Sequence, residues 1–224
     1  MFRGMLLSAL LLAATPVLAQ QEQQVLVDRA TLAVQEVMST GDRPEDAQDT
    51  LKRARAVLVC PRIFRAGFII GGDGGPCLLI GRDGGGSWSS PAFYAMGSGS
   101  IGLQIGIQDF SLVVMVMNDR ALQALLNSQF RFGGDASLTF ATIGAGVGGG
   151  TTSAVGADYV SLSRSRGLFA GVSLQGSLMS FVSDDVRAYY GREASARQIV
   201  IGMEVHNPNA DPLRAMLMRY GTRG

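Results

Sequence analysis

Apolar side chains recur at helical spacing near the start of the chain. Leu26, Ala30, Ala33, Val34 and Val37 follow one another at steps of one, three or four residues. This spacing places side chains on one face of an α-helix. The pattern predicts an amphipathic helix that ends before Gly41.

A second helix is predicted directly after the first. Asp42-Arg43-Pro44-Glu45 brings a proline and acidic side chains to the first turn, where helix N-termini favour them. Residues 45–59 then carry one apolar stripe, made of Ala47, Leu51, Ala54 and Leu58. Pro61 is expected to stop this helix.

From Ile63 the hydrophobic period changes to two, the period of β-strands. Residues 101–108 alternate Ile or Leu with Gly or Gln and predict a half-buried strand, whereas the apolar run 112–117 predicts a central one. Asn118-Asp119 is expected to cap a short helix with Leu122, Leu125 and Leu126 inward. Further strands are predicted at 137–143, 159–163 and 168–175, the last two as a hairpin, and helices at 183–190 and from Asp211 until Gly221.

Helices, then a run of strands with inserted helices, then a terminal helix indicate the α+β class. We expect a single domain built on a curved antiparallel β-sheet, with N-terminal helices and a C-terminal helix. No repeat of 20–50 residues and no linker divides the chain.

Two glycine clusters, residues 71–75 and 83–86, predict turns between strands. If strands 63–70 and 77–82 pair across the first turn, Cys60 lies near residue 87 of the partner strand, roughly 33 Å from Cys77. A disulfide needs Cα atoms within about 7 Å. We therefore expect two separate, mostly buried thiols, unless the chain reverses sharply at Pro61.

The first nineteen residues have the pattern of a secretory signal peptide. A basic start, an apolar run over Met5–Ala14 and small residues before a cleavage point after Ala19 make up this pattern. Residues 20–224 are then expected to form the domain, in the periplasm or secreted, with an uncleaved N-terminal helix as the alternative. Loss of Arg3 leaves 18 basic against 18 acidic residues, a balance that argues against nucleic-acid binding.

The residues that catalysis would need are scarce. The only histidine, His206, lies in a polar turn, so a serine or cysteine nucleophile lacks an obvious base. One histidine and two distant cysteines make no metal-ligand set. Asp184 and Asp185 fit the first turn of a helix as capping charges. Matches to G-x-G-x-x-G at 97–102 and 144–149 do not open a helix. We expect no enzyme: no catalytic residue, no cofactor and no metal.

Five cations lie within fourteen residues of one another: Lys52, Arg53, Arg55, Arg62 and Arg65. On the predicted helix, Lys52, Arg53 and Arg55 flank the apolar stripe. Such long side chains can lie along apolar surface and reach lipid head groups. A solvated helix face explains the same charges equally well.

Several short motifs then follow in a recognisable order: Ala56-Val-Leu-Val-Cys-Pro61, Arg65-Ala-Gly-Phe68, Trp88-Ser89, Ser90-Pro-Ala-Phe-Tyr94, Ser100-Ile-Gly-Leu-Gln-Ile-Gly106, Val114-Met-Val-Met-Asn118, the segment 166–176 and Tyr189-Tyr-Gly191. Together they resemble the SYLF domain, a lipid-binding module also called the Ysc84 or Las17-binding actin-regulator domain. The resemblance covers about residues 25–195 and leaves a C-terminal helical extension.

The resemblance implies a non-enzymatic module. Eukaryotic members bind phosphoinositide-containing membranes, and some bind actin; bacterial members are exported. It also implies lipid contact through an amphipathic helix and basic residues, which here are helix 45–59 and Lys52, Arg53, Arg55, Arg62 and Arg65. An exported bacterial chain is not expected to meet actin or phosphoinositides.

The resulting hypothesis is a non-enzymatic lipid-binding protein of the cell envelope whose partner is an anionic phospholipid membrane. The alternative is a structural or protein-interaction module of the envelope. Its sheet edges, or a flat face at Gly102 and Gly106, would dock an envelope protein or a second copy.

Overall fold

The computed structural model describes residues 15–40, 44–67, 70–101, 106–127, 129–134, 138–143, 156–166 and 176–222. The elements in chain order are α1 (Thr15–Ser39), α2 (Pro44–Arg53), β1 (Ala56–Gly67), β2 (Ile70–Gly81), β3 (Ala92–Ile101), β4 (Gly106–Val116), α3 (Asp119–Leu125), β5 (Gln129–Arg131), β6 (Phe140–Ile143), β7 (Tyr159–Arg166), β8 (Leu178–Phe181), α4 (Ser183–Tyr190), α5 (Ala196–Val200), the 3₁₀ turn η1 (Pro208–Ala210) and α6 (Asp211–Gly221).

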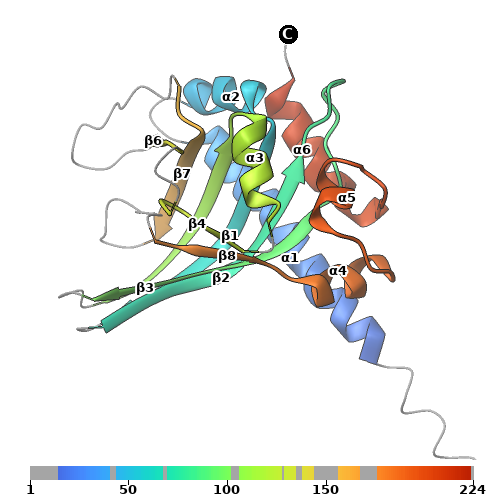
Figure 1. Cartoon of the computed structure of the whole chain (residues 1–224), viewed down its shortest axis with the longest axis horizontal. Coiled ribbons are helices and arrows are strands. Elements are labelled where there is room, and N and C mark those ends of the chain that lie inside the picture. Colours follow the sequence, from blue (N-terminus) through green and yellow to red (C-terminus); the bar gives the residue numbers. More distant parts are fainter. Residues whose placement is uncertain are drawn as a thin grey trace, which may run out of the picture.

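The strands form one curled sheet in the order β5-β8-β3-β2-β1-β4-β7-β6 (Figure 1). Every described pair is antiparallel except β6 and β7, which run parallel. The predicted α+β class is confirmed: a curved and mainly antiparallel sheet is preceded along the chain by N-terminal helices and followed by a C-terminal helix.

Helices cover both faces of the sheet. Helix α1 lies behind it and α3 in front of it in Figure 1. Tyr94 of β3 and Tyr159 of β7 each donate a hydrogen bond to a backbone carbonyl of α3, at Leu125 and Ala121 respectively. Because a buried tyrosine hydroxyl needs a partner, these two bonds fix α3 inside the curve of the sheet.

The predicted helix 45–59 is wrong in its second half. Helix α2 ends at Arg53, and residues 56–60 form the start of β1, fully buried between β2 and β4. A strand buried on both faces has a continuous apolar sequence, so Leu58 suited a helical stripe as well as a strand. Sheet pairing, which local periodicity does not report, decides the outcome.

Two strand predictions also need correction. The glycine-rich residues 71–75 lie within β2 and pair with both β1 and β3, rather than forming a turn. Residues 101–108 are not one strand, because β3 ends at Ile101 and β4 begins at Gly106. The second glycine cluster does turn, and Gly86 has a φ of 91°, a conformation that favours glycine.

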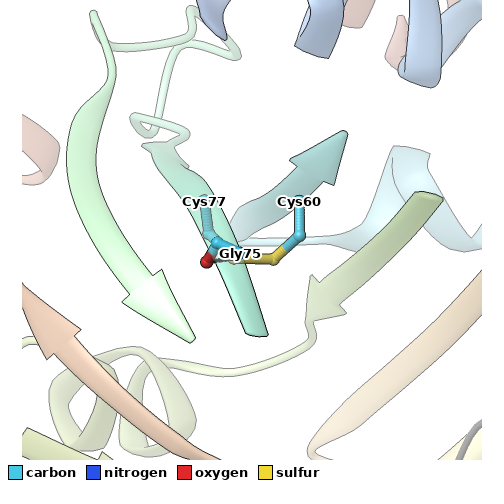
Figure 2. Close-up of a disulfide and its surroundings, with 3 residues drawn as sticks. All are labelled: Cys60, Gly75 and Cys77. Carbon is cyan, nitrogen blue, oxygen red and sulfur yellow. Dashed lines mark hydrogen bonds between the residues drawn. A yellow bond between two sulfur atoms is a disulfide. The ribbon is translucent and has the colours of Figure 1, made fainter. Parts of the chain in front are cut away.

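Cys60 and Cys77 form a disulfide, contrary to the expectation of separate thiols (Figure 2). Val59 lies opposite Leu78, so the next residue of β1 faces Cys77, and the two Cα atoms are 4.1 Å apart. Because residues 71–75 were wrongly predicted to form a turn, Cys60 was expected to lie near residue 87 instead of opposite Cys77. A one-residue bulge follows at residues 61–62, where a Cβ on Gly75 would approach the Arg62 carbonyl to 2.2 Å.

Of the remaining expectations, some are confirmed and some lie outside the described residues, while a few elements were not anticipated. Helices α1, α3, α4 and α6 and the central strand β4 lie where the pattern predicts them. Strands β5 and β8 and helix α5 were not anticipated. The predicted strand 168–175, the flat face at Gly102 and most of the predicted signal peptide lie outside the described residues, although α1 runs through the expected cleavage point after Ala19.

Candidate functional site

Three of the predicted cations gather where α2 passes into β1. Lys52 and Arg53 occupy the last turn of α2, where a positive charge complements the helix dipole, and Arg55 is the second residue after the helix. Buried Leu51 and Ala54 hold this segment against the core. The result is a cationic end of the molecule, which we call the α2–β1 junction (Lys52, Arg53 and Arg55).

The other two cations lie elsewhere. Arg62 is six residues into β1, roughly 20 Å from the start of the strand at the usual rise, and it pairs with Asp109. Arg65 pairs with Asp73. Asp109 lies opposite Phe64 and Asp73 opposite Arg65, so Arg62 and Arg65 project from opposite faces of the sheet. The five cations therefore do not form one patch.

Four of the five cations have a carboxylate partner. Lys52 pairs with Asp49 at 2.9 Å and Arg55 with Asp119 at 2.8 Å; the two aspartates are largely exposed, and the two cations are 37% and 42% exposed. Exposed ion pairs contribute only about 0–1 kcal/mol each, so an incoming phosphate can replace such a partner. Arg53 is exposed and forms no side-chain hydrogen bond or ion pair within the described part of the chain.

Arg65 differs from the other four in its surroundings. Two of its N–H groups donate to Asp73, whose side chain is only 8% exposed, and Ser98 donates to the other carboxylate oxygen at 2.7 Å. The guanidinium also lies over the Phe110 ring, 5.3 Å from its centre. These contacts give Arg65 a structural role between three strands and leave it the least accessible cation of the set.

Sequence reasoning missed Arg82, which lies beside the junction. Its guanidinium donates to the carbonyls of Lys52 at the end of α2 and of Gly221 at the end of α6, both at 2.8 Å. It also lies over the Trp88 ring. A cation at two helix C-termini satisfies carbonyls that the helices cannot bond themselves. No local signal marks this role, since the three segments meet only in the folded chain.

The structure also brings His206 beside a serine. His206 Nδ1 lies 3.3 Å from Ser90 Oγ, and Nε2 lies 3.7 Å from Asp211 Oδ1. Ser90 is only 3% exposed and its Oγ accepts a hydrogen bond from the Asn207 backbone N–H. A substrate carbonyl cannot reach this oxygen, so the group joins the β2–β3 connection to the C-terminal segment rather than forming a nucleophilic site.

Two further findings concern metal binding and membrane crossing. Among the described residues, no group of three His, Cys, Asp or Glu side chains could hold a metal ion. Within the same part of the chain, no helix combines the length and the apolar character needed to cross a bilayer.

Comparison with known proteins matches residues 97–220 to the family model Ysc84, described as Las17-binding protein actin regulator. The chain belongs to this family. The motifs that suggested the resemblance were therefore a correct guide.

Curated relatives of this Ysc84 family extend the match toward the N-terminus. An SH3 domain-containing protein of Schizosaccharomyces pombe is 31% identical over 84% of this chain and 43% of its own length. LAS seventeen-binding protein 3 of Saccharomyces cerevisiae is 30% identical over 75% of this chain and 37% of its own length. The human SH3 domain-containing YSC84-like protein 1 is 29% identical over 69% and 46% respectively.

The chain thus spans less than half the length of these relatives. Their names are those of binding and SH3-domain proteins, not of enzymes, in agreement with the expected non-enzymatic character.

Proposed function

We propose that this Ysc84-family chain is a non-enzymatic lipid-binding protein of the cell envelope, and that anionic head groups bind at the α2–β1 junction. The observation that carries the proposal is the exposed cation Arg53, which has no ion pair among the described residues and lies between Lys52 and Arg55, whose ion pairs are weak. The family resemblance supports it, because it implies lipid contact through basic residues beside an amphipathic helix.

Two features support an envelope location. The apolar N-terminal run has the pattern of an export signal. The Cys60–Cys77 disulfide is a bond that forms and persists in oxidising compartments such as the periplasm. In that setting the partner would be a bacterial anionic phospholipid rather than a phosphoinositide.

Each cation near an anionic surface contributes about 1 kcal/mol. The three junction cations would then contribute roughly 3 kcal/mol, about 100-fold in affinity. Arg62 would add to this only on a membrane that also reaches the α1 side of the sheet. Arg65 would contribute least, because its carboxylate partner is buried.

Co-flotation with vesicles tests the proposal. Disulfide-containing protein is mixed with vesicles that contain or lack anionic lipid, at about 0.1 M and about 1 M salt, where the screening length is roughly 10 Å and roughly 3 Å. We expect anionic lipid to add a component of binding that is present at low salt and lost at high salt. The variant Lys52→Glu/Arg53→Glu/Arg55→Glu should lose it.

The control reverses three exposed arginines of the α4–α5 region, Arg187, Arg192 and Arg197, with the same change in net charge. Equal losses in both variants would show a net-charge effect rather than a site. Absence of binding to any vesicle would refute the proposal.

The second candidate is a protein-interaction module. It is favoured by a relative named for binding Las17, and its docking elements would be the edge strands β5 and β6. Strand pairing barely responds to salt, so salt-independent retention of an envelope protein with no vesicle binding would favour it.

A further inference from the structure

An exposed apolar face lies beside α1 on the outer side of the sheet. Phe64 and Ala66 of β1 alternate outward, and Ile107 of β4 lies opposite Ala66. Phe64 is 47% exposed and Ile107 is 75% exposed. Leu32 on α1 is 65% exposed, and it shares a groove with neighbours of Phe64. Among the described residues six large apolar side chains are exposed, and these three are the most exposed of them.

The neighbouring strands make this face flat. Gly74 lies between Phe64 and Gly97, and Gly72 lies between Ala66 and Gly99, so four glycines continue the same face across β2 and β3. A Cβ at Gly99 would meet nothing within 4 Å, and one at Gly97 only a single carbonyl oxygen at 3.9 Å. Packing against the described residues therefore does not require glycine at these two positions.

A groove of about 390 Å³ lies between α1 and strands β1 and β4, beside this face. Its volume lies in the range of small-molecule sites. The side chains that give it its character are Arg29, Leu32, Ala33, Glu36, Arg62 and Asp109.

The charges of this groove balance, with two cations and two carboxylates around an apolar floor. Arg62 donates to Asp109 at 2.5 Å. Arg29 is exposed and forms no ion pair within the described part of the chain. This arrangement complements a ligand that carries both a negative and a positive charge on an apolar body, and not a purely anionic surface.

We propose that this outer face, defined as Leu32, Phe64, Ala66, Ile107 and the glycines at 72, 74, 97 and 99, inserts into the interface of a phospholipid bilayer. The groove beside it holds a zwitterionic head group such as phosphoethanolamine, with the phosphate at Arg29 and Arg62 and the ammonium at Glu36 and Asp109. The inference deepens the proposed lipid-binding function, on which it rests, and names a second contact surface and its lipid class.

The physical basis is the chemistry of an interfacial surface. Apolar side chains that enter the boundary between head groups and acyl chains lose water contact and so favour binding. A face without side chains on β2 and β3 allows lipid to approach the backbone closely. Because the charged groups balance, binding through this face should tolerate salt, whereas binding through the α2–β1 junction should not.

The test measures partitioning of the full chain into vesicles of phosphatidylethanolamine and phosphatidylcholine that contain no anionic lipid. The variant Phe64→Thr/Ile107→Thr keeps strand-forming residues and leaves the core untouched. We expect it to lower partitioning roughly 10- to 100-fold, since two large apolar side chains leave the interface. The control is Ile201→Thr, which replaces an apolar residue about as exposed as Phe64 beyond the opposite end of β2 and should bind as wild type.

Two further variants make the test specific. Arg29→Gln should lower partitioning up to about fivefold, because it removes a groove cation that no described residue pairs and, with it, one exposed contact to the lipid phosphate. Phe64→Trp should gain fluorescence that brominated acyl chains quench, while the wild-type Trp88, only 1% exposed, should not be quenched. Unchanged partitioning of Arg29→Gln would overturn the head-group assignment.

The outcomes separate the two proposals. If Phe64→Thr/Ile107→Thr binds vesicles as the wild type does, while reversal of the junction cations abolishes binding, this inference is overturned and the proposed function stands. Absence of wild-type binding to every vesicle would overturn both. A change in oligomeric state of Phe64→Thr/Ile107→Thr by light scattering, with unaltered vesicle binding, would assign the face to a second copy and refute the inference.

Discussion

Breaking the Cys60–Cys77 bond tests the register of the β1–β2 pair and the stability that the bond supplies. The half-cystines are fully buried and lie 17 residues apart in the chain. The perturbation is reduction of the wild type, which keeps both sulfur atoms and so changes packing less than replacement does. The β1–β2 ladder remains on both sides of the bond, so the reduced protein should still fold.

The expected loss follows from the entropy of the unfolded chain. A cross-link between residues this far apart removes conformations from the unfolded ensemble and stabilises the fold by about 3 kcal/mol at 25 °C. For a domain of this length, that change lowers the melting temperature by roughly 6–12 °C. The unfolded cross-linked chain also exposes less surface, so its urea m-value should be lower than that of the reduced chain.

The assay is urea unfolding followed by circular dichroism, with and without reductant. The matched control is Cys60→Ala/Cys77→Ala, whose transition should not respond to reductant. A transition midpoint of the wild type that reduction leaves unchanged would refute the entropic reasoning. Two titratable thiols in never-reduced, denatured protein would refute the register itself.

Two carboxylates provide further predictions. Burial acts to raise the pKa of Asp158. Hydrogen bonds from Asn118, Thr139 and Arg120 outweigh burial and hold the pKa well below its ordinary value. The ionised carboxylate therefore stabilises the fold above about pH 4, and this contribution is lost below it. Asp158→Asn should destabilise the protein by about 2–4 kcal/mol at pH 6, with a smaller difference at pH 3. Urea midpoints of wild type and variant that differ by the same amount at both pH values would contradict this. Burial raises the pKa of Asp185, which accepts a hydrogen bond from Gln23, whose own buried Oε1 has no partner among the described residues. Asp185→Asn should stabilise the protein by about 1 kcal/mol at pH 7, because it removes a partly buried charge and adds a donor for Gln23 Oε1. This gain should shrink as the pH falls and the wild-type carboxyl protonates. A melting temperature of Asp185→Asn below that of the wild type at pH 7 would refute the prediction.

Local patterns predicted much of the fold. The helical spacing from Leu26 to Val37, the cap at Asn118 and the acids in the first turn of α4 each lie within one element, and all three elements form as expected. The ordered motifs identified the family for the same reason, since each motif is a short continuous segment. What failed was the assignment of buried, two-sided segments such as residues 56–60, whose apolar run suits either a helix or a strand.

The candidate site was predicted only in part. The five cations were identified by their density in the sequence, but a strand sends successive side chains to opposite faces, and the bulge at residues 61–62 changes that alternation. Arg62 and Arg65 consequently lie on opposite faces, away from the α2–β1 junction. Neither the carboxylates that pair with these cations nor the exposed face around Phe64 and Ile107 could be found from neighbouring residues, because both depend on strand register.

Periodicity, capping residues and motif order are properties of short segments, so the amino-acid order alone was enough to specify helices α1, α3, α4 and α6, the α+β class and the family. The disulfide, the contact of Arg82 with two helix ends, the Ser90–His206 pair and the outer face depend on which distant segments lie side by side. Those contacts are set by register, twist and bulges, where a shift of one residue moves every following side chain to the other face of the sheet. For this reason they became visible only in the folded chain.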